Sequence, residues 1–110
     1  MENKNMNSLN TELLKGIFEL VVLFLISKKP MYGYEITTYL QENHTFTLAN
    51  GSIYPILQRL IKKGWASSFE EYHKGRIRKY YETTKEGRTI ALSNFKRLEN
   101  VYDFLRLLKE

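Results

Sequence analysis

The sequence predicts a mainly α-helical domain of the α+β class that carries one small β-hairpin. Two observations lead to this fold class. Apolar residues recur at three- and four-residue steps in four stretches, and after Gly64 the period changes to β-branched and aromatic runs on either side of a turn. With 110 residues, of which 43% are hydrophobic and 26% charged, the chain has the composition of one globular domain whose core a second subunit would help to cover.

The charge is unevenly distributed along the chain. The formal net charge is +5, and residues 50–82 hold seven Lys or Arg against three acids. An excess of cations in one third of the chain suits an anionic partner. The sequence has no cysteine, no paired carboxylates, no glycine-rich phosphate loop and no metal-ligand spacing. We therefore expect neither an enzyme nor a metal or cofactor site.

The amino-terminal sequence does not resemble a secretion signal, and the apolar run 17–26 is too short to span a bilayer. We therefore expect a cytoplasmic, nucleoid-associated protein that does not contact a membrane.

The stretch 50–64 predicts a helix with two different faces. Asn50 or Ser52 can cap its start, Pro55 is tolerated in the first turn, and Gly64 can supply a left-handed residue at its end. One face is apolar; the other carries Ser52, Tyr54, Gln58, Arg59, Lys62 and Lys63. A helix of this length fits the major groove of DNA, whereas the simpler interpretation is an ordinary amphipathic surface helix.

Two further helices are expected before this one. The first should run from Asn10 or Thr11 to about Ser27, and Pro30 follows its end. The second should span Tyr32–Glu42 with Ile36, Tyr39 and Leu40 facing inward. A connector over 43–49 then leads into the stretch 50–64, and this spacing is typical of a helix-turn-helix. We interpret His44 in the connector as a solvated loop residue rather than a ligand.

Residues 65–83 predict a β-hairpin, with strands at Trp65–Tyr72 and Ile77–Thr83 and a turn over residues 73–76. Its tip and second strand carry the cations Lys74, Arg76, Arg78 and Lys79. A basic hairpin attached directly to a helix-turn-helix is typical of a wing that contacts DNA phosphates; taken alone, it could equally be a solvated turn.

The last predicted helix spans Lys85–Lys109, with Thr84 as its cap and Gly87 where a capping-box glutamate would stand. Its apolar residues form a heptad seam: Ala91, Phe95, Leu98, Tyr102 and Leu105. About 25 residues make a helix roughly 37 Å long, so we expect it to pack against a second copy; the alternative is that it folds back onto its own domain. The predicted division is a flexible terminus (1–10), a winged helix-turn-helix (11–83) and a dimerisation helix (84–110).

Several segments together resemble the PadR family of bacterial transcriptional regulators. They are LKG with Glu19, PMYGYEI at 30–36, GSIYPILQRL at 51–60, Gly64-Trp65, RKYY at 78–81 and TKEG at 84–87. The resemblance covers about residues 13–108, and the single last helix is similar to the compact branch of that family. Two positions depart from the family pattern: Thr83 replaces a usual leucine, which predicts a less well packed strand end, and Ser52 replaces a commoner threonine.

This resemblance implies a winged helix-turn-helix dimer that binds a palindromic operator and is released by a small molecule. It implies DNA contacts at Tyr34, Ser52, Tyr54, Gln58, Lys74 and Arg76. It also places Phe18, Phe95, Leu98 and Tyr102 near any effector, for which we expect a planar aromatic or apolar compound.

The resulting hypothesis is a homodimeric, sequence-specific repressor of transcription that binds double-stranded DNA. The alternative is a winged-helix protein-interaction module that binds an acidic protein and lacks sequence-specific DNA binding.

Overall fold

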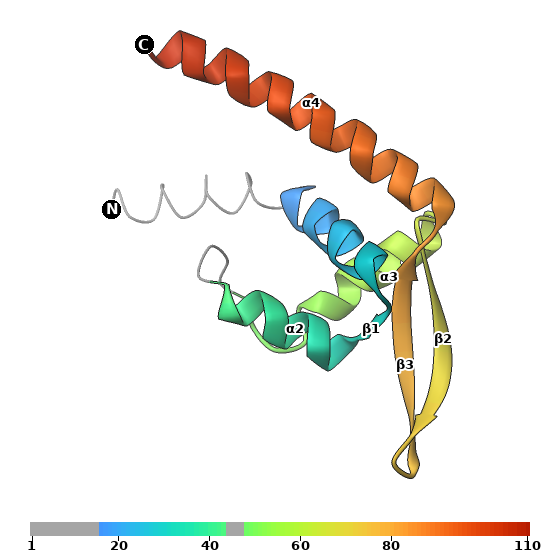
Figure 1. The fold of residues 1–110 in the computed structure, drawn as a ribbon. Coiled ribbons are helices and arrows are strands. Elements are labelled where there is room, and N and C mark those ends of the chain that lie inside the picture. The colour runs from blue at the N-terminus through green and yellow to red at the C-terminus, as the bar shows by residue number, and fades with distance from the viewer. Residues whose placement is uncertain (1–15, 44–47) are drawn as a thin grey trace.

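The computed structural model describes residues 16–43 and 48–110 and confirms the α+β class (Figure 1). Residues 16–28 are helical. The elements that follow are β1 (Met31–Tyr32), α2 (Gly33–Glu42), α3 (Ile53–Lys62), β2 (Ala66–His73), β3 (Arg76–Thr83) and α4 (Lys85–Lys109). The expected start of the first helix, at Asn10 or Thr11, lies outside the described residues, as does His44.

The hydrophobic core lies where the first helix, α2 and α3 meet the root of the sheet. Its most deeply buried large side chains are Val22, Ile26, Ile36, Ile53, Leu57 and Leu60. Burial of one such side chain contributes about 1.5–3 kcal/mol. Because α3 supplies three of these six side chains, the core fixes which face of α3 is left for solvent.

A short strand, β1, was not predicted, and it places Tyr32 outside the second helix. Met31 pairs with Tyr81 and Tyr32 with Tyr80, which gives an antiparallel sheet in the order β1-β3-β2. Tyr32 caps α2 from extended backbone (φ −91°, ψ 164°), and its N–H donates to Glu35 Oε1 at 3.1 Å. The prediction that the helix begins at Tyr32 is therefore wrong by one residue, because Tyr32 pairs with Tyr80 in the sheet.

The second helix also differs from the prediction in which side chains it buries. Ile36 and Leu40 are in the core as expected, whereas Tyr39 is 55% exposed. Thr37, next to Ile36, is buried instead. The inward face of α2 is thus rotated away from Tyr39, and the prediction that Tyr39 faces inward is wrong.

The start of α3 is not capped by a side chain as the sequence predicts. Ser52 has helical backbone (φ −71°, ψ −13°) and makes no side-chain cap; its hydroxyl donates to the carbonyl of Ala49 at 2.6 Å. Asn50 Oδ1 instead accepts from Gln41 Nε2 at 3.0 Å, which ties the connector to α2. The predicted end is confirmed, since Gly64 has a φ of +80°.

The hairpin has the predicted position but a tighter turn. Its pairs run from Ala66↔Thr83 to His73↔Arg76, which leaves only Lys74 and Gly75 in the turn. Both residues have positive φ, as a two-residue type I′ turn requires. The predicted turn over residues 73–76 is therefore two residues too long, and the hairpin projects as a two-stranded arm well beyond the core (Figure 1).

Two neighbouring threonines join the hairpin to the helices. Thr83 Oγ1 donates to the carbonyl of Leu23 at 2.6 Å, which ties β3 to the first helix. The expectation of a poorly packed strand end at Thr83 therefore overlooked a hydrogen bond that leucine could not make. Thr84 accepts from the N–H of Gly87 at 3.0 Å, which confirms it as the cap of α4.

Gly87 lies against the backbone carbonyl of Trp65, and this explains the missing capping-box glutamate. A Cβ at this position would overlap that carbonyl and crowd Thr83. We expect Gly87→Ala to lower the free energy of unfolding by about 1–3 kcal/mol, because the backbone must shift. Gly16→Ala is the control: apart from its own helix, no described part of the chain lies within 4 Å of the added Cβ, and helix propensity favours alanine by up to about 1 kcal/mol. Urea unfolding of both variants checks this; equal stabilities would contradict the packing described.

Candidate nucleic-acid interface

The solvent-exposed face of α3 presents Tyr54, Gln58 and Lys62 in one row. These residues are four positions apart, so they follow one another along the same side of the helix. The opposite face is buried, and α3 contains no acidic residue. Tyr54 and Gln58 can donate and accept hydrogen bonds, and Lys62 carries a positive charge. The row therefore has the chemistry to contact base edges near its start and phosphates near its end.

Tyr54 is held by the start of α2. Its ring lies directly against Gly33, where a Cβ would overlap the ring and the hydroxyl. Around this contact lies a small cavity of about 170 Å³, lined by Tyr32, Gly33, Tyr34, Tyr54, Arg78, Lys79 and Tyr81. Burial, and secondarily the nearby phenol of Tyr54, raises the pKa of Tyr81 above its ordinary value. The Tyr81 phenol is therefore neutral at physiological pH, and the charges at this cavity are cationic.

Gly33→Ala tests whether this seat positions Tyr54. The added methyl group must displace the Tyr54 ring, so we expect weaker binding to a specific DNA site, by about 1–3 kcal/mol, the value of one base contact. Binding to unrelated DNA should change little, because no cation is removed. Fluorescence anisotropy with both duplexes measures the difference. An equal loss on both would show that Tyr54 placement does not matter for sequence preference.

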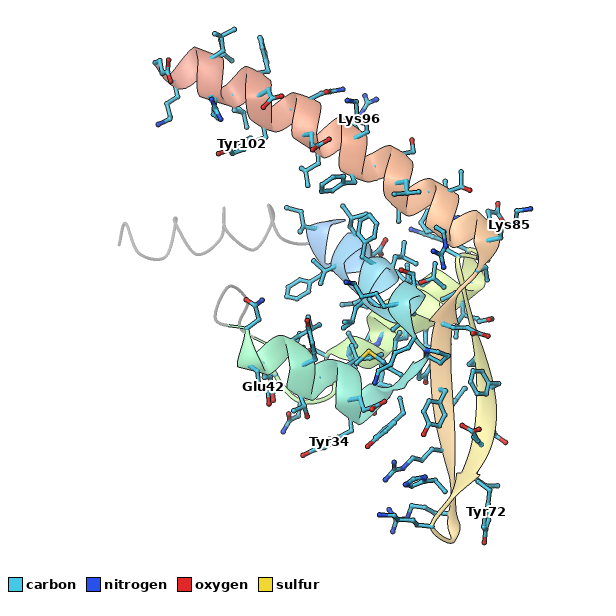
Figure 2. All side chains as sticks on the ribbon, viewed as in Figure 1. Tyr34, Glu42, Tyr72, Lys85, Lys96 and Tyr102 are labelled. Carbon is cyan, nitrogen blue, oxygen red and sulfur yellow. The ribbon has the colours of Figure 1, made fainter. Side chains whose placement is uncertain are left out.

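The predicted wing cations fall into two pairs. Lys74 and Arg76 lie at the exposed hairpin tip. The Arg78 guanidinium packs 4.3 Å from the ring centroid of Tyr32, and the Lys79 ammonium lies 5.9 Å from that of Tyr81. The second pair thus lies beside the root of α2, while the first extends outward. In Figure 2, Tyr34 on α2 and Tyr72 near the hairpin tip lie on the side of the molecule opposite α4.

Arg59 of α3 and Lys63, the residue that follows this helix, differ from the other predicted DNA contacts because they have an acidic partner among the described residues. Arg59 Nε lies 2.9 Å from Glu19 Oε2, and Lys63 Nζ lies 3.6 Å from Glu19 Oε1. Both side chains therefore turn toward the first helix. In the sequence, Glu19 stands among the segments that carry the family resemblance, and no local spacing connects it with two cations forty or more positions away.

Comparison with known proteins identifies the family. Residues 22–92 match the model of the transcriptional regulator PadR-like family. The chain belongs to the PadR-like family of transcriptional regulators. The resemblance found in the sequence is thereby confirmed, and the family acts in regulation rather than catalysis.

Solved structures of transcriptional regulators, two of them described as PadR or PadR-like, share the fold over nearly the whole chain. A PadR family regulator from Eggerthella lenta is 27% identical, with a TM-score of 0.87 over 99% of this chain and 96% of that one. A Streptococcus transcriptional regulator is 34% identical, with a TM-score of 0.82 over 91% and 99%. A PadR-like regulator from Bacillus cereus is 32% identical, with a TM-score of 0.78 over 90% and 97%. The predicted winged-helix architecture is confirmed by these matches.

The PadR helix α4 presents a second surface, on which the predicted seam residues are not equivalent. Ala91 is buried in the core of its own chain, so it is not free to contact a second copy, and the prediction is corrected there. Phe95 packs edge-on against Phe24, with ring centroids 5.9 Å apart. Farther along, α4 leaves the body (Figure 1), and its large apolar side chains are 38–71% exposed: Leu98, Val101, Tyr102, Phe104, Leu105, Leu107 and Leu108.

The predicted effector residues are divided between the body and α4, and Tyr102 lies on the exposed outer half of that helix. Phe18 on the first helix is half-buried against the core, and Leu98 lines a cavity of about 280 Å³ between the first helix and α4. Over residues 16–43 and 48–110, no cluster of three metal-ligating side chains exists, and none of the helices combines the length and hydrophobicity needed to cross a bilayer.

Proposed function

We propose that this PadR-like regulator is a homodimeric repressor that binds a pseudo-palindromic DNA operator and is released by a small-molecule effector. The observation that carries the proposal is the exposed row of Tyr54, Gln58 and Lys62, which lies beside a basic hairpin and contains no acid. The core leaves this face of α3 to solvent, and the wing lies next to it in sequence and space (Figure 1).

Sequence preference would come from the start of α3. Ser52, Tyr54 and Gln58 would contact base edges in the major groove, with Tyr34 beside them on α2. All four side chains are exposed. Ser52 already donates its hydroxyl to Ala49, so it would offer bases its oxygen as an acceptor.

Affinity would come from the cations. Lys62 on α3 and Lys74, Arg76, Arg78 and Lys79 on the hairpin would neutralise phosphates and release counterions. Arg59 and Lys63 could join them only by leaving Glu19, because both are paired with its carboxylate. The proposed interface therefore has two kinds of cation. Lys62 and the hairpin cations are available in the free protein, whereas Arg59 and Lys63 must first leave Glu19.

Dimerisation would cover the exposed apolar face of α4. Seven large apolar side chains exposed on one stretch of helix, from Leu98 to Leu108, are unusual on a monomer and typical of a protein interface. Two α3 helices related by a two-fold axis would read half-sites about one helical turn, roughly 10 base pairs, apart or a multiple of that. An apolar or aromatic effector that binds between the subunits would favour a different separation of the two α3 helices and so release the DNA.

Lys74→Ala tests the wing. Loss of one phosphate contact should lower the slope of log affinity against log salt by about 0.9 for each wing engaged. It should weaken binding to all sequences equally, since phosphates carry no sequence information. Lys96→Ala on α4 is the control: it removes the same charge from an exposed site on the opposite side of the molecule (Figure 2). Fluorescence anisotropy at several salt concentrations measures both slopes.

If Lys74→Ala and Lys96→Ala gave the same slope as the unmodified protein, the hairpin would not touch phosphates. A protein-interaction module would behave differently again. It would bind duplex DNA poorly even at low salt, and it would show no preference for the region upstream of its own coding sequence.

A further inference from the structure

The ammonium group of Lys63 lies between a carboxylate and the face of an indole ring, two groups that bind ammonium ions in general. It is 3.6 Å from the carboxylate of Glu19 and 4.8 Å from the ring centroid of Trp65. A carboxylate and the face of an indole together provide the charge and the ring quadrupole that attract such a cation. The Glu19 side chain is 20% exposed, so solvent screens it only partly. The contacts of the Lys63 ammonium group thus indicate how Glu19 and Trp65 would bind an organic ammonium ion.

Both groups that hold Lys63 also line the cavity between the first helix and α4. Its volume is about 280 Å³. The rest of its wall is largely apolar, with Ile17, Leu20, Leu23 and Leu98 and the amide of Asn94. An apolar cavity with one carboxylate and one aromatic ring matches a small ligand that has an apolar body and a cationic head.

We propose that Glu19 and Trp65 form a binding site for a small organic ammonium ion, with the cavity holding its apolar body and Lys63 occupying the cationic position in the free protein. The site lies within one chain and is separate from the exposed outer half of α4. Its existence depends only on the geometry of Glu19, Trp65 and the cavity.

The site would be coupled to DNA, and this step rests on the proposed function. When Lys63 and Arg59 turn to phosphates, the Glu19 carboxylate, whose side chain is 20% exposed with both cations in place, loses both of them. A partly buried carboxylate without a partner is costly, so an external ammonium binds best in that state. Coupling between two binding sites is reciprocal. The ammonium ion therefore raises the affinity for DNA by the same factor by which bound DNA raises the affinity for the ammonium ion. It therefore acts as a co-repressor, opposite in sign to the releasing effector.

Binding can be measured without DNA. Trp65 is the only tryptophan of the chain, so its fluorescence reports directly on the site. The probes are benzylammonium and its neutral analogue benzyl alcohol. Lys63→Met removes the ammonium group beside Trp65 and keeps most of the length of the side chain, while Arg59 still pairs with Glu19. We expect this variant to bind benzylammonium at least about tenfold more tightly than benzyl alcohol, as a charge-assisted contact implies.

Two further variants, each combined with Lys63→Met, locate the site. Glu19→Gln should abolish the preference for benzylammonium, whereas Glu99→Gln, which removes an equal charge from an exposed position on α4, should preserve it. Thermal melting confirms that all variants are folded. Equal affinity for the two probes in Lys63→Met, or a preference that survives Glu19→Gln, would overturn the proposal.

The coupling is tested with the unmodified protein and a DNA duplex. Benzylammonium should raise DNA affinity, and Glu19→Gln should remove this effect. If the protein bound no DNA at all, the proposed function would fail while the fluorescence result still decided the ammonium site. If DNA bound but benzylammonium left its affinity unchanged, the link through Lys63 would be wrong.

Discussion

Leu105→Glu is expected to convert the protein to a monomer and to lower its affinity for a two-half-site operator by about 10²–10⁴-fold. Leu105 is 56% exposed in the last turns of α4, so the described part of its own chain does not bury it. A carboxylate buried there in a dimer interface would lack a partner. In a dimer, once one α3 helix has bound its half-site, the α3 helix of the partner binds the other half-site intramolecularly. A monomer loses this advantage.

Sedimentation velocity gives the oligomeric state of this variant, and anisotropy gives its DNA affinity. Ser93→Glu is the matched control, because it adds one carboxylate to an exposed polar position of α4, on a different side of the helix from the buried Ala91. The control should remain dimeric and bind DNA normally. A dimeric Leu105→Glu protein would show that another surface joins the subunits.

Gln58→Ala is expected to cost about 1–3 kcal/mol of binding to the preferred site and to relax the preference at one base position. Gln58 lies in the middle of the exposed row of α3, and its side chain forms no hydrogen bond to another described residue. Its amide is therefore available to a base edge, where a bidentate contact is characteristic of glutamine with adenine.

A panel of duplexes with single base-pair changes measures this effect. Lys62→Ala, one turn farther along the same row, is the comparison: it should weaken binding to every duplex by a similar factor. A Gln58→Ala protein that kept the full preference at every position would remove Gln58 from base recognition.

Local sequence signals were sufficient for most of the fold. The helical period predicted the span of α4, and a glycine-containing turn segment, 73–76, between two β-rich runs predicted the hairpin. Thr84 caps α4 as predicted, because its hydroxyl accepts a hydrogen bond from the N–H of Gly87, three residues later. These features depend on interactions between residues close in sequence, which is why spacing alone revealed them.

The features that were missed depend on contacts between distant segments. The two-residue strand β1 exists because Met31 and Tyr32 pair with Tyr81 and Tyr80, and no two-residue pattern can reveal that. Tyr39 is exposed because the packing of α2 against α3 and the sheet determines which face of α2 is buried.

The candidate site shows the same division. The exposed row of α3 follows from its amphipathic period, but the partner of Arg59 and Lys63 does not. Their pairing with Glu19 joins residues forty or more positions apart, and it separates cations that composition alone had grouped together.

The central claim is that two copies of this chain bind one operator, each through α3 and its hairpin. Sedimentation velocity of a labelled duplex from the region upstream of the protein's own coding sequence tests it most directly. We predict a complex of two chains per duplex, formed cooperatively and weakened by salt. A single chain per duplex, or no salt-sensitive complex at all, would contradict the account.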